Sequence, residues 1–133
     1  PGLLADYRRK AIYLMRFFSN YRPYVTGSVL NRSAGPHSNI NLLLYHDDPK
    51  TLEIFLIDRK IDYQYKESAG VPHVPGYPTL SFWYDDTPVL LHVRPLAAER
   101  NGSHREERAS LVEMEKMLDD AGPDMAAGHG GKD

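Results

Sequence analysis

A glycine followed by a serine, Gly27-Ser28, stands where a short extended segment passes into a turn. Glycine has no side chain, so the backbone there can approach a ligand closely. The serine supplies a hydroxyl and a backbone N–H at the start of a helical turn, where the helix dipole favours an anion. The pair is therefore suited to holding phosphate oxygens, although a Gly-Ser pair alone also fits an ordinary turn.

A second polar pair, Asn39 and Asn41, lies in a segment that alternates as a β-strand does. Successive side chains on a strand point to opposite faces, so the two asparagines share one face. The other face is uniformly apolar and is expected to be core; it consists of Ile40, Leu42 and Leu44. This parity places both amides beside any ligand that Gly27-Ser28 holds.

This order of a strand, Gly-Ser, a short helical turn and a strand with two polar residues resembles the DNA polymerase β-like nucleotidyltransferase superfamily. In that superfamily the second strand carries Asp-x-Asp. The resemblance covers roughly Tyr7 to Pro95 and points to the small bacterial nucleotidyltransferase-domain proteins. It implies an α+β fold, and transfer of an NMP from an NTP to an acceptor with two Mg²⁺ ions held by three carboxylates.

The chain departs from that motif at each expected metal ligand. Asn39 and Asn41 stand at the Asp-x-Asp positions, and the third position falls on a later strand, where His92 matches the register better than Leu90 or Arg94. An amide oxygen brings no negative charge, whereas Mg²⁺ prefers anionic oxygen ligands. We therefore expect Mg²⁺ to bind weakly or not at all at Asn39 and Asn41, and two-metal transfer to be severely impaired.

Asp62 and Arg32 are further candidates for the site. Asp62 begins a later strand, and in some small proteins that the sequence resembles an acid there completes the triad, which makes it a candidate substitute carboxylate. Arg32 follows the Gly-Ser turn, and a guanidinium suits a phosphate. The simpler interpretations are a solvated carboxylate and a surface arginine.

Aromatic residues are concentrated in the later strands, at Tyr63, Tyr65, Trp83 and Tyr84. Such side chains can stack on a nucleotide base. Aromatic strand residues more often pack against cross-strand neighbours or helices. We therefore expect core packing for these four residues.

The composition excludes several classes of protein. The 133 residues include no cysteine, so disulfides, cysteine-ligated zinc and thiol nucleophiles are absent. Lys and Arg number 16 against 18 Asp and Glu, for a net charge of −2, which does not favour nucleic acid or a membrane as partner. No segment is long and apolar enough to span a bilayer and no signal peptide is evident, so we expect a cytoplasmic protein.

The apolar pattern predicts the elements that position these groups. Helices are expected from Leu3 to Asn20 and from Pro49 to about Lys60, and a capping box of Ser103 and Glu106 predicts a last helix. The first helix is expected to have a basic outer face of Arg8, Arg9, Lys10 and Arg16. Strands are predicted at 24–26, 39–45, 61–65, 79–84 and 89–94. These elements predict one α+β domain over 1–120, with a mixed sheet of about five strands and helices mainly on one face, and a flexible tail at 121–133.

Three functional hypotheses follow. The first is a nucleotidyltransferase-like domain with a degenerate metal site, which serves as a nucleotide-binding, regulatory or partner-docking module with little or no catalysis. The second is an active nucleotidyltransferase that uses Asp62 or acids from a partner chain. The third is an antitoxin-like module that binds a protein and no nucleotide. The expected partners are accordingly a nucleoside triphosphate or a protein.

Overall fold

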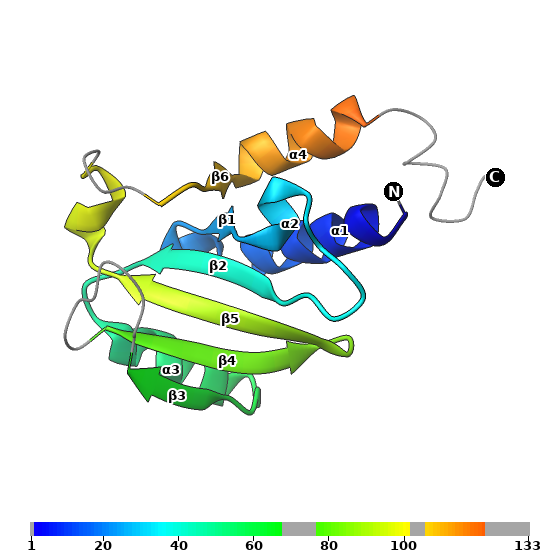
Figure 1. The fold of residues 1–133 in the computed structure, drawn as a ribbon. Helices are drawn as coiled ribbons and strands as arrows, with labels where there is room; N and C mark the ends of the chain where they lie inside the picture. The colour runs from blue at the N-terminus through cyan, green and yellow to red at the C-terminus, as the bar shows by residue number, and fades with distance from the viewer. Residues whose placement is uncertain (1, 68–76, 102–105, 122–133) are drawn as a thin grey trace.

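Six strands form one mixed sheet in the order β3-β4-β5-β2-β1-β6 (Figure 1). The computed structural model describes residues 2–67, 77–101 and 106–121. The strands are β1 (Tyr24–Thr26), β2 (Ile40–Tyr45), β3 (Gln64–Glu67), β4 (Pro78–Tyr84), β5 (Thr87–Arg94) and β6 (Ala109–Ser110). Neighbouring strands are antiparallel except β2 and β5, which run parallel. The predicted mixed sheet is confirmed, with one strand more than expected.

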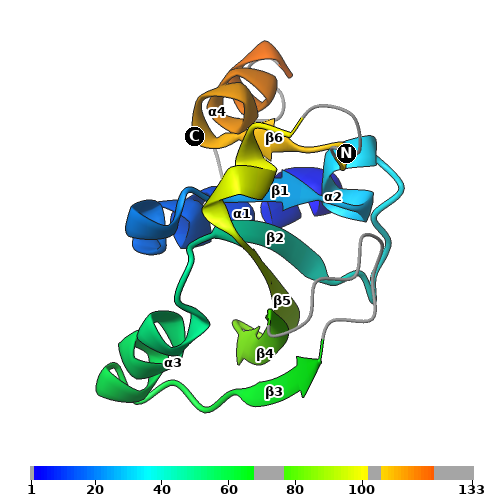
Figure 2. The ribbon, with the colours of Figure 1, turned by 90° about the vertical axis from the view of Figure 1, so that its left-hand side faces the viewer.

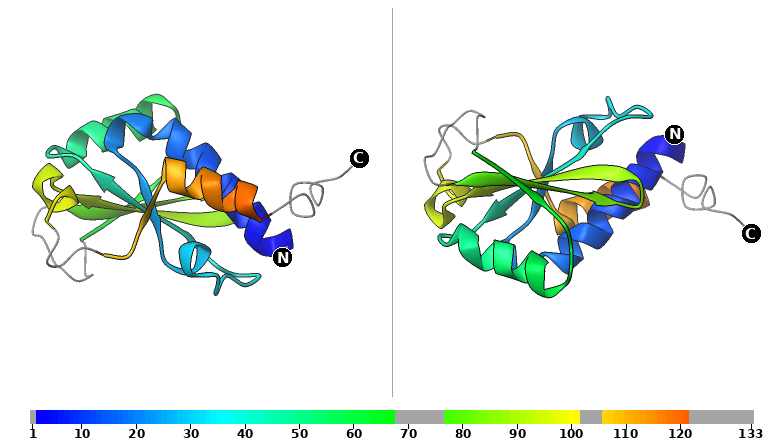
Figure 3. Two further views of the ribbon diagram at one scale, coloured as in Figure 1. Left: turned by 90° about the horizontal axis from the view of Figure 1, so that it is seen from above. Right: turned by 90° about the horizontal axis from the view of Figure 1, so that it is seen from below.

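Helices α1 (Gly2–Phe17) and α3 (Pro49–Asp58) cover the same face of the sheet, as Figures 2 and 3 show. The short α2 (Ser28–Asn31) lies on the opposite side, and α4 (Leu111–Asp120) lies against α1. Two 3-10 turns, η1 (Ser19–Tyr21) and η2 (Leu96–Glu99), follow α1 and β5. Within the described ranges, no helix combines the length and the apolar character that crossing a membrane requires. The expected placement of helices mainly on one face is confirmed.

The core lies between α1, α3 and the sheet face that they cover. The predicted apolar face of β2 is fully buried there, and β5 and the two helices supply the side chains that meet it. The residues at 0% exposure in this layer include Ala11, Met15, Phe18, Ile40, Leu42, Leu44, Leu52, Leu56, Val89, Leu91 and Val93. Removing this apolar surface from water is the main stabilising contribution to the sheet and its helices.

The other face of β2, β4 and β5 carries polar side chains, and we call it the polar face, defined by Asn41, Thr79, His92 and Arg94. Hydrogen bonds join Asn41 and Thr79 to His92, so these side chains project on the same side of the sheet. Arg94 follows His92 by two residues on β5 and therefore shares its side. Helices α1 and α3 lie behind this face, which leaves room over it for the segment that follows β5.

The predicted capping box of Ser103 and Glu106 is wrong. Helix α4 begins at Leu111, where Ser110 and Glu113 exchange the two bonds of a capping box, at 3.2 and 2.7 Å. The chain before this helix is extended instead, because β6 pairs with β1. Ser103 and the predicted tail beyond residue 121 lie outside the described residues.

The first helix has less of a basic outer face than predicted, because Arg8 points inward and Lys10 pairs with a neighbouring turn. Arg8 is 6% exposed and donates from Nε and Nη2 to the carbonyls of Val29 and Leu30, at 3.1 and 3.0 Å. Lys10 Nζ lies 3.3 Å from Asp85 Oδ2 in the turn between β4 and β5. Both side chains therefore tie α1 to neighbouring segments.

Helix α3 starts as predicted, whereas β3 starts later. Asp48 is the N-cap, its Oδ1 accepts from Lys50 N–H at 3.1 Å, and Pro49 occupies the first turn. The predicted strand at 61–65 is shifted to Gln64–Glu67. One reason is that the Tyr63 hydroxyl donates to Glu53 Oε1 at 2.6 Å, which holds the chain against α3 before it can join the sheet.

Candidate functional site

Gly27 brings the turn after β1 against the start of β2. Its φ of 78° and ψ of −154° lie in a region that only glycine adopts without strain. A methyl group on its Cα would come within 3.1 Å of Asn41 Nδ2. The structure thus places Gly27, the N-cap of α2, beside Asn41, as strand parity predicts. Ser28 follows as the first residue of α2.

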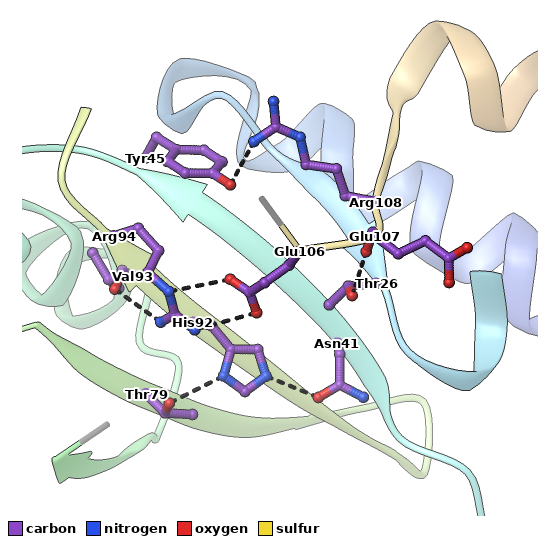
Figure 4. Close-up of polar contacts among 10 residues, drawn as sticks. All are labelled: Thr26, Asn41, Tyr45, Thr79, His92, Val93, Arg94, Glu106, Glu107 and Arg108. Carbon is purple, nitrogen blue, oxygen red and sulfur yellow. Dashed lines mark hydrogen bonds and ion pairs between the residues drawn. The ribbon is translucent and has the colours of Figure 1, made fainter. Parts of the chain in front are cut away.

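Asn41, His92 and Thr79 form a hydrogen-bonded chain across three strands of the polar face (Figure 4). His92 Nε2 lies 2.9 Å from Asn41 Oδ1, and His92 Nδ1 lies 3.1 Å from Thr79 Oγ1. An amide oxygen can only accept, so Nε2 carries the proton and Nδ1 accepts from the Thr79 hydroxyl. Asn41 and His92 stand at two of the positions where the superfamily has carboxylates. The structure joins these two side chains by a hydrogen bond.

The bond to His92 also fixes the orientation of the Asn41 amide. With Oδ1 turned to His92, Nδ2 faces the backbone of Gly27. An amide nitrogen is a donor with two N–H groups, whereas the aspartate of the superfamily motif offers only acceptors. The uncharged N–H donors of Asn41 therefore lie beside the turn at Gly27-Ser28.

His92 is neutral at physiological pH. Burial, assisted by the nearby Arg94 guanidinium, lowers the pKa of His92 from its usual 6.5 to about 4. Burial has this effect because it penalises the charged form of the imidazole. The Asn41–His92 pair therefore carries no net charge at pH 7.

Glu106 is a carboxylate over the polar face that the sequence analysis missed as a site residue. Its oxygens lie 3.3 Å from Arg94 Nε and 3.4 Å from Arg94 Nη2 (Figure 4). Arg94 is 4% exposed, and its Nε has no hydrogen-bond partner among the described residues, so the contact at Nε is one of charge without hydrogen-bond alignment. Glu106 is thus engaged in neutralising a buried cation.

Glu106→Gln is expected to lower the free energy of unfolding by about 1–3 kcal/mol, because it leaves the buried Arg94 cation beside a neutral group. Adding Arg94→Met removes the uncompensated charge and should recover much of the loss. Urea unfolding at pH 7 of the wild type, both single variants and the double variant measures this coupling. Glu107→Gln, an exposed neighbour, is the control, and an equal loss there would contradict the assignment.

Arg108 holds the chain after β5 beside the polar face. Its Nη1 donates to the Tyr45 hydroxyl at 2.6 Å, and its Nη2 donates to the carbonyl of Glu99 at 2.8 Å. The guanidinium carbon lies 3.9 Å from the centre of the Tyr24 ring, a cation–π distance. These contacts position the segment from which Glu106 reaches Arg94.

Besides Gly27 and Ser28, three predicted site residues lie outside the hydrogen-bonded chain. Asn39 is exposed and directly precedes β2, and Arg32 is exposed at φ 72° after α2. Asp62 is exposed between α3 and the edge strand β3. Because β4 and β5 separate β3 from β2 in the sheet, β3 lies about 14 Å from Asn41 at the usual strand spacing. The structure therefore does not bring Asp62 beside Asn41 and His92.

No protein-family model matches the sequence, and no curated protein matches it. Among solved structures, the chain is similar to a cytoplasmic RNA terminal U-transferase, at 17% sequence identity and a TM-score of 0.41. The match covers 67% of this chain and 26% of that protein.

Proposed function

We propose that this chain is a nucleotidyltransferase-like domain that binds the phosphates of a nucleotide without two-metal catalysis. The observation that carries the proposal is the bond between His92 Nε2 and Asn41 Oδ1, which leaves the site uncharged and turns the Asn41 amide nitrogen toward Gly27. The order of strand, Gly-Ser turn and polar strand supports the superfamily. The hydrogen bonds support the loss of metal chemistry.

The donor set at this site does not fit a pair of Mg²⁺ ions. Asn41 Oδ1 already accepts a hydrogen bond, and the protonated Nε2 of His92 has no lone pair for a metal. Within the described ranges, no group of three or more His, Asp or Glu side chains is arranged to hold a metal ion. Mg²⁺ gives up its water ligands reluctantly and only for hard, anionic oxygens. The residues present therefore do not fit a two-metal mechanism.

The same replacements favour an anion without a metal. An aspartate beside a phosphate needs a cation between the two, whereas an amide N–H donates to phosphate directly. Asn41 Nδ2 lies on the Gly27 side of β2, and Ser28 adds a hydroxyl at the same turn. Asn41 therefore offers a donor beside the Gly27-Ser28 turn, where the superfamily binds triphosphate, and Ser28 offers a second donor from the turn itself.

Thermal unfolding with ligands tests the proposal. In EDTA, ATP and inorganic tripolyphosphate at about 100 times Kd should each add about 2.7 kcal/mol of stability, seen as a rise in Tm of roughly 5–15 °C. Asn41→Asp should abolish the shift, because it replaces the donor with a like charge. Asn20→Asp, an exposed site with the same charge change, should keep it.

The outcomes separate the three hypotheses. A shift that requires Mg²⁺ or Mn²⁺ would overturn the proposal in favour of an active nucleotidyltransferase. No shift with either ligand, with or without metal, would overturn it in favour of a module that binds only protein.

A further inference from the structure

Trp83 stands uncovered on the same side of the sheet as the proposed phosphate site. Its exposure is 72%, and the expectation that it packs in the core is therefore wrong. The Thr79 side chain belongs to the polar face, because it is hydrogen-bonded to His92. Trp83 follows Thr79 by four residues on β4. Side chains an even number of residues apart share a face, so the indole lies on the polar side.

A pocket of about 390 Å³ adjoins this indole. Trp83 and Pro88 supply apolar wall, the turn residues Asp85 and Asp86 supply carboxylates, and the loop before β2 contributes His37 and Ser38. The first turns of α1 close the other side of the pocket with Leu3, Asp6, Tyr7 and Lys10. The turn is a tight two-residue hairpin with φ of 49° and 62°, so the carboxylates sit on a rigid support. Ligand sites of this kind combine an apolar wall with a few convergent polar groups.

The distance between the pocket at Trp83 and the proposed phosphate site at Asn41 matches the length of an extended nucleoside triphosphate. Trp83 pairs with Pro88 on β5, and Asn41 pairs with Leu90 on the same strand. Two strand spacings and two residues of rise separate the two side chains by about 12 Å. Ser38, at the rim of the pocket, is followed by Asn39 and the start of β2. One extended nucleoside triphosphate can therefore reach both places.

We infer that this pocket holds the base of the nucleotide, with the Trp83 indole as its stacking platform and the Asp86 carboxylate as an acceptor, since the Asp85 carboxylate already pairs with Lys10. The inference rests on the proposed function. Every base has a π-face to stack on an indole, and a carboxylate accepts from an exocyclic amino group. The ligand class is thus a nucleoside triphosphate whose base carries such an amino group, in preference to uracil.

Trp83 is the only tryptophan of the chain, so its fluorescence reports on its own contact with a ligand. In EDTA, ATP should quench the emission, whereas tripolyphosphate, which lacks a base, should bind without quenching. Trp83→Ala should weaken ATP roughly 5- to 100-fold, from the stacking energy of a base. Binding of tripolyphosphate should not change, and Trp83→Phe should recover part of the affinity for ATP.

Tyr65→Ala, an exposed aromatic on β3, is the matched control and should leave the affinity for ATP unchanged. Equal affinity of wild type and Trp83→Ala for ATP would overturn the inference while leaving the proposed function intact. If the wild type bound neither ATP nor tripolyphosphate, both the inference and the proposed function would be overturned. Equal affinity for UTP and ATP would overturn the role of the Asp86 carboxylate.

Discussion

Gly27→Ala is expected to lower the free energy of unfolding by about 2–4 kcal/mol, from backbone strain and crowding combined. At φ 78° and ψ −154°, any residue with a Cβ is strained. The new methyl group would also lie 3.1 Å from Asn41 Nδ2, so either the amide or the turn must shift. Urea unfolding followed by circular dichroism measures the loss, and thermal shift with tripolyphosphate should show weakened binding in the same variant.

Two further variants separate the causes of this loss. Gly35→Ala is the matched control, because a methyl group there meets nothing within 4 Å, and its effect should stay near zero. In an Asn41→Ala background the crowding at Gly27 is relieved, so Gly27→Ala should cost less than in the wild type while the backbone strain persists. Equal losses at Gly27 and Gly35 would contradict the role of this turn.

The alternation of β2 was predictable because one of its faces has to be apolar. Ile40, Leu42 and Leu44 are fully buried, as expected, and parity alone then places Asn41 on the other face. The same reasoning on the partner strand identified His92, and the structure joins the two side chains by a 2.9 Å bond. The alternation of apolar and polar side chains along β2 predicts the structure correctly, because a shift of one residue in strand pairing would bury the amides and expose the leucines.

The role of Glu106 was not predictable, because it depends on pairing between distant segments. The pairs Ser103/Glu106 and Ser110/Glu113 both satisfy the local pattern of a capping box. The second forms because Ala109 and Ser110 pair with Val25 and Tyr24 on β1. That pairing holds the preceding residues extended and delivers the Glu106 carboxylate to Arg94.

The burial of Arg8 illustrates a second limit of sequence patterns. Helical periodicity assigns a cation to the outside unless something inside needs a donor. Here the carbonyls of Val29 and Leu30 in α2 need one, and Arg8 donates to both of them. Nothing in the sequence of α1 records where α2 will lie, so the contact emerges only in the folded chain.

Trp83 was expected to pack in the core and is exposed instead. Large aromatic side chains on strands are usually covered, and Leu80 and Phe82 on the same strand are buried. The alternation that buries Phe82 turns Trp83 outward, onto the face that α1 and α3 do not cover. The sequence shows the alternation of side chains along β4. It does not show whether another segment covers the second face of the sheet.

Acid is expected to destabilise the protein through His92. The pKa of His92 is lowered by burial to about 4 in the folded chain, against 6.5 for an ordinary histidine. Above pH 6.5 the imidazole is neutral in both states and contributes no pH dependence. As the pH falls from 6.5 to 4, the unfolded chain takes up a proton that the folded chain refuses, so about 3 kcal/mol of stability is lost.

Urea unfolding between pH 7 and pH 4 measures this loss, with His92→Gln as the test variant. Glutamine keeps a neutral donor and acceptor but does not titrate, so the stability advantage of the wild type over this variant should shrink by about 3 kcal/mol across the range. His37→Gln removes an exposed histidine and should follow the wild-type pH profile. If His92→Gln also followed that profile, His92 would not be the buried neutral partner of Asn41, and the uncharged site would have to be explained otherwise.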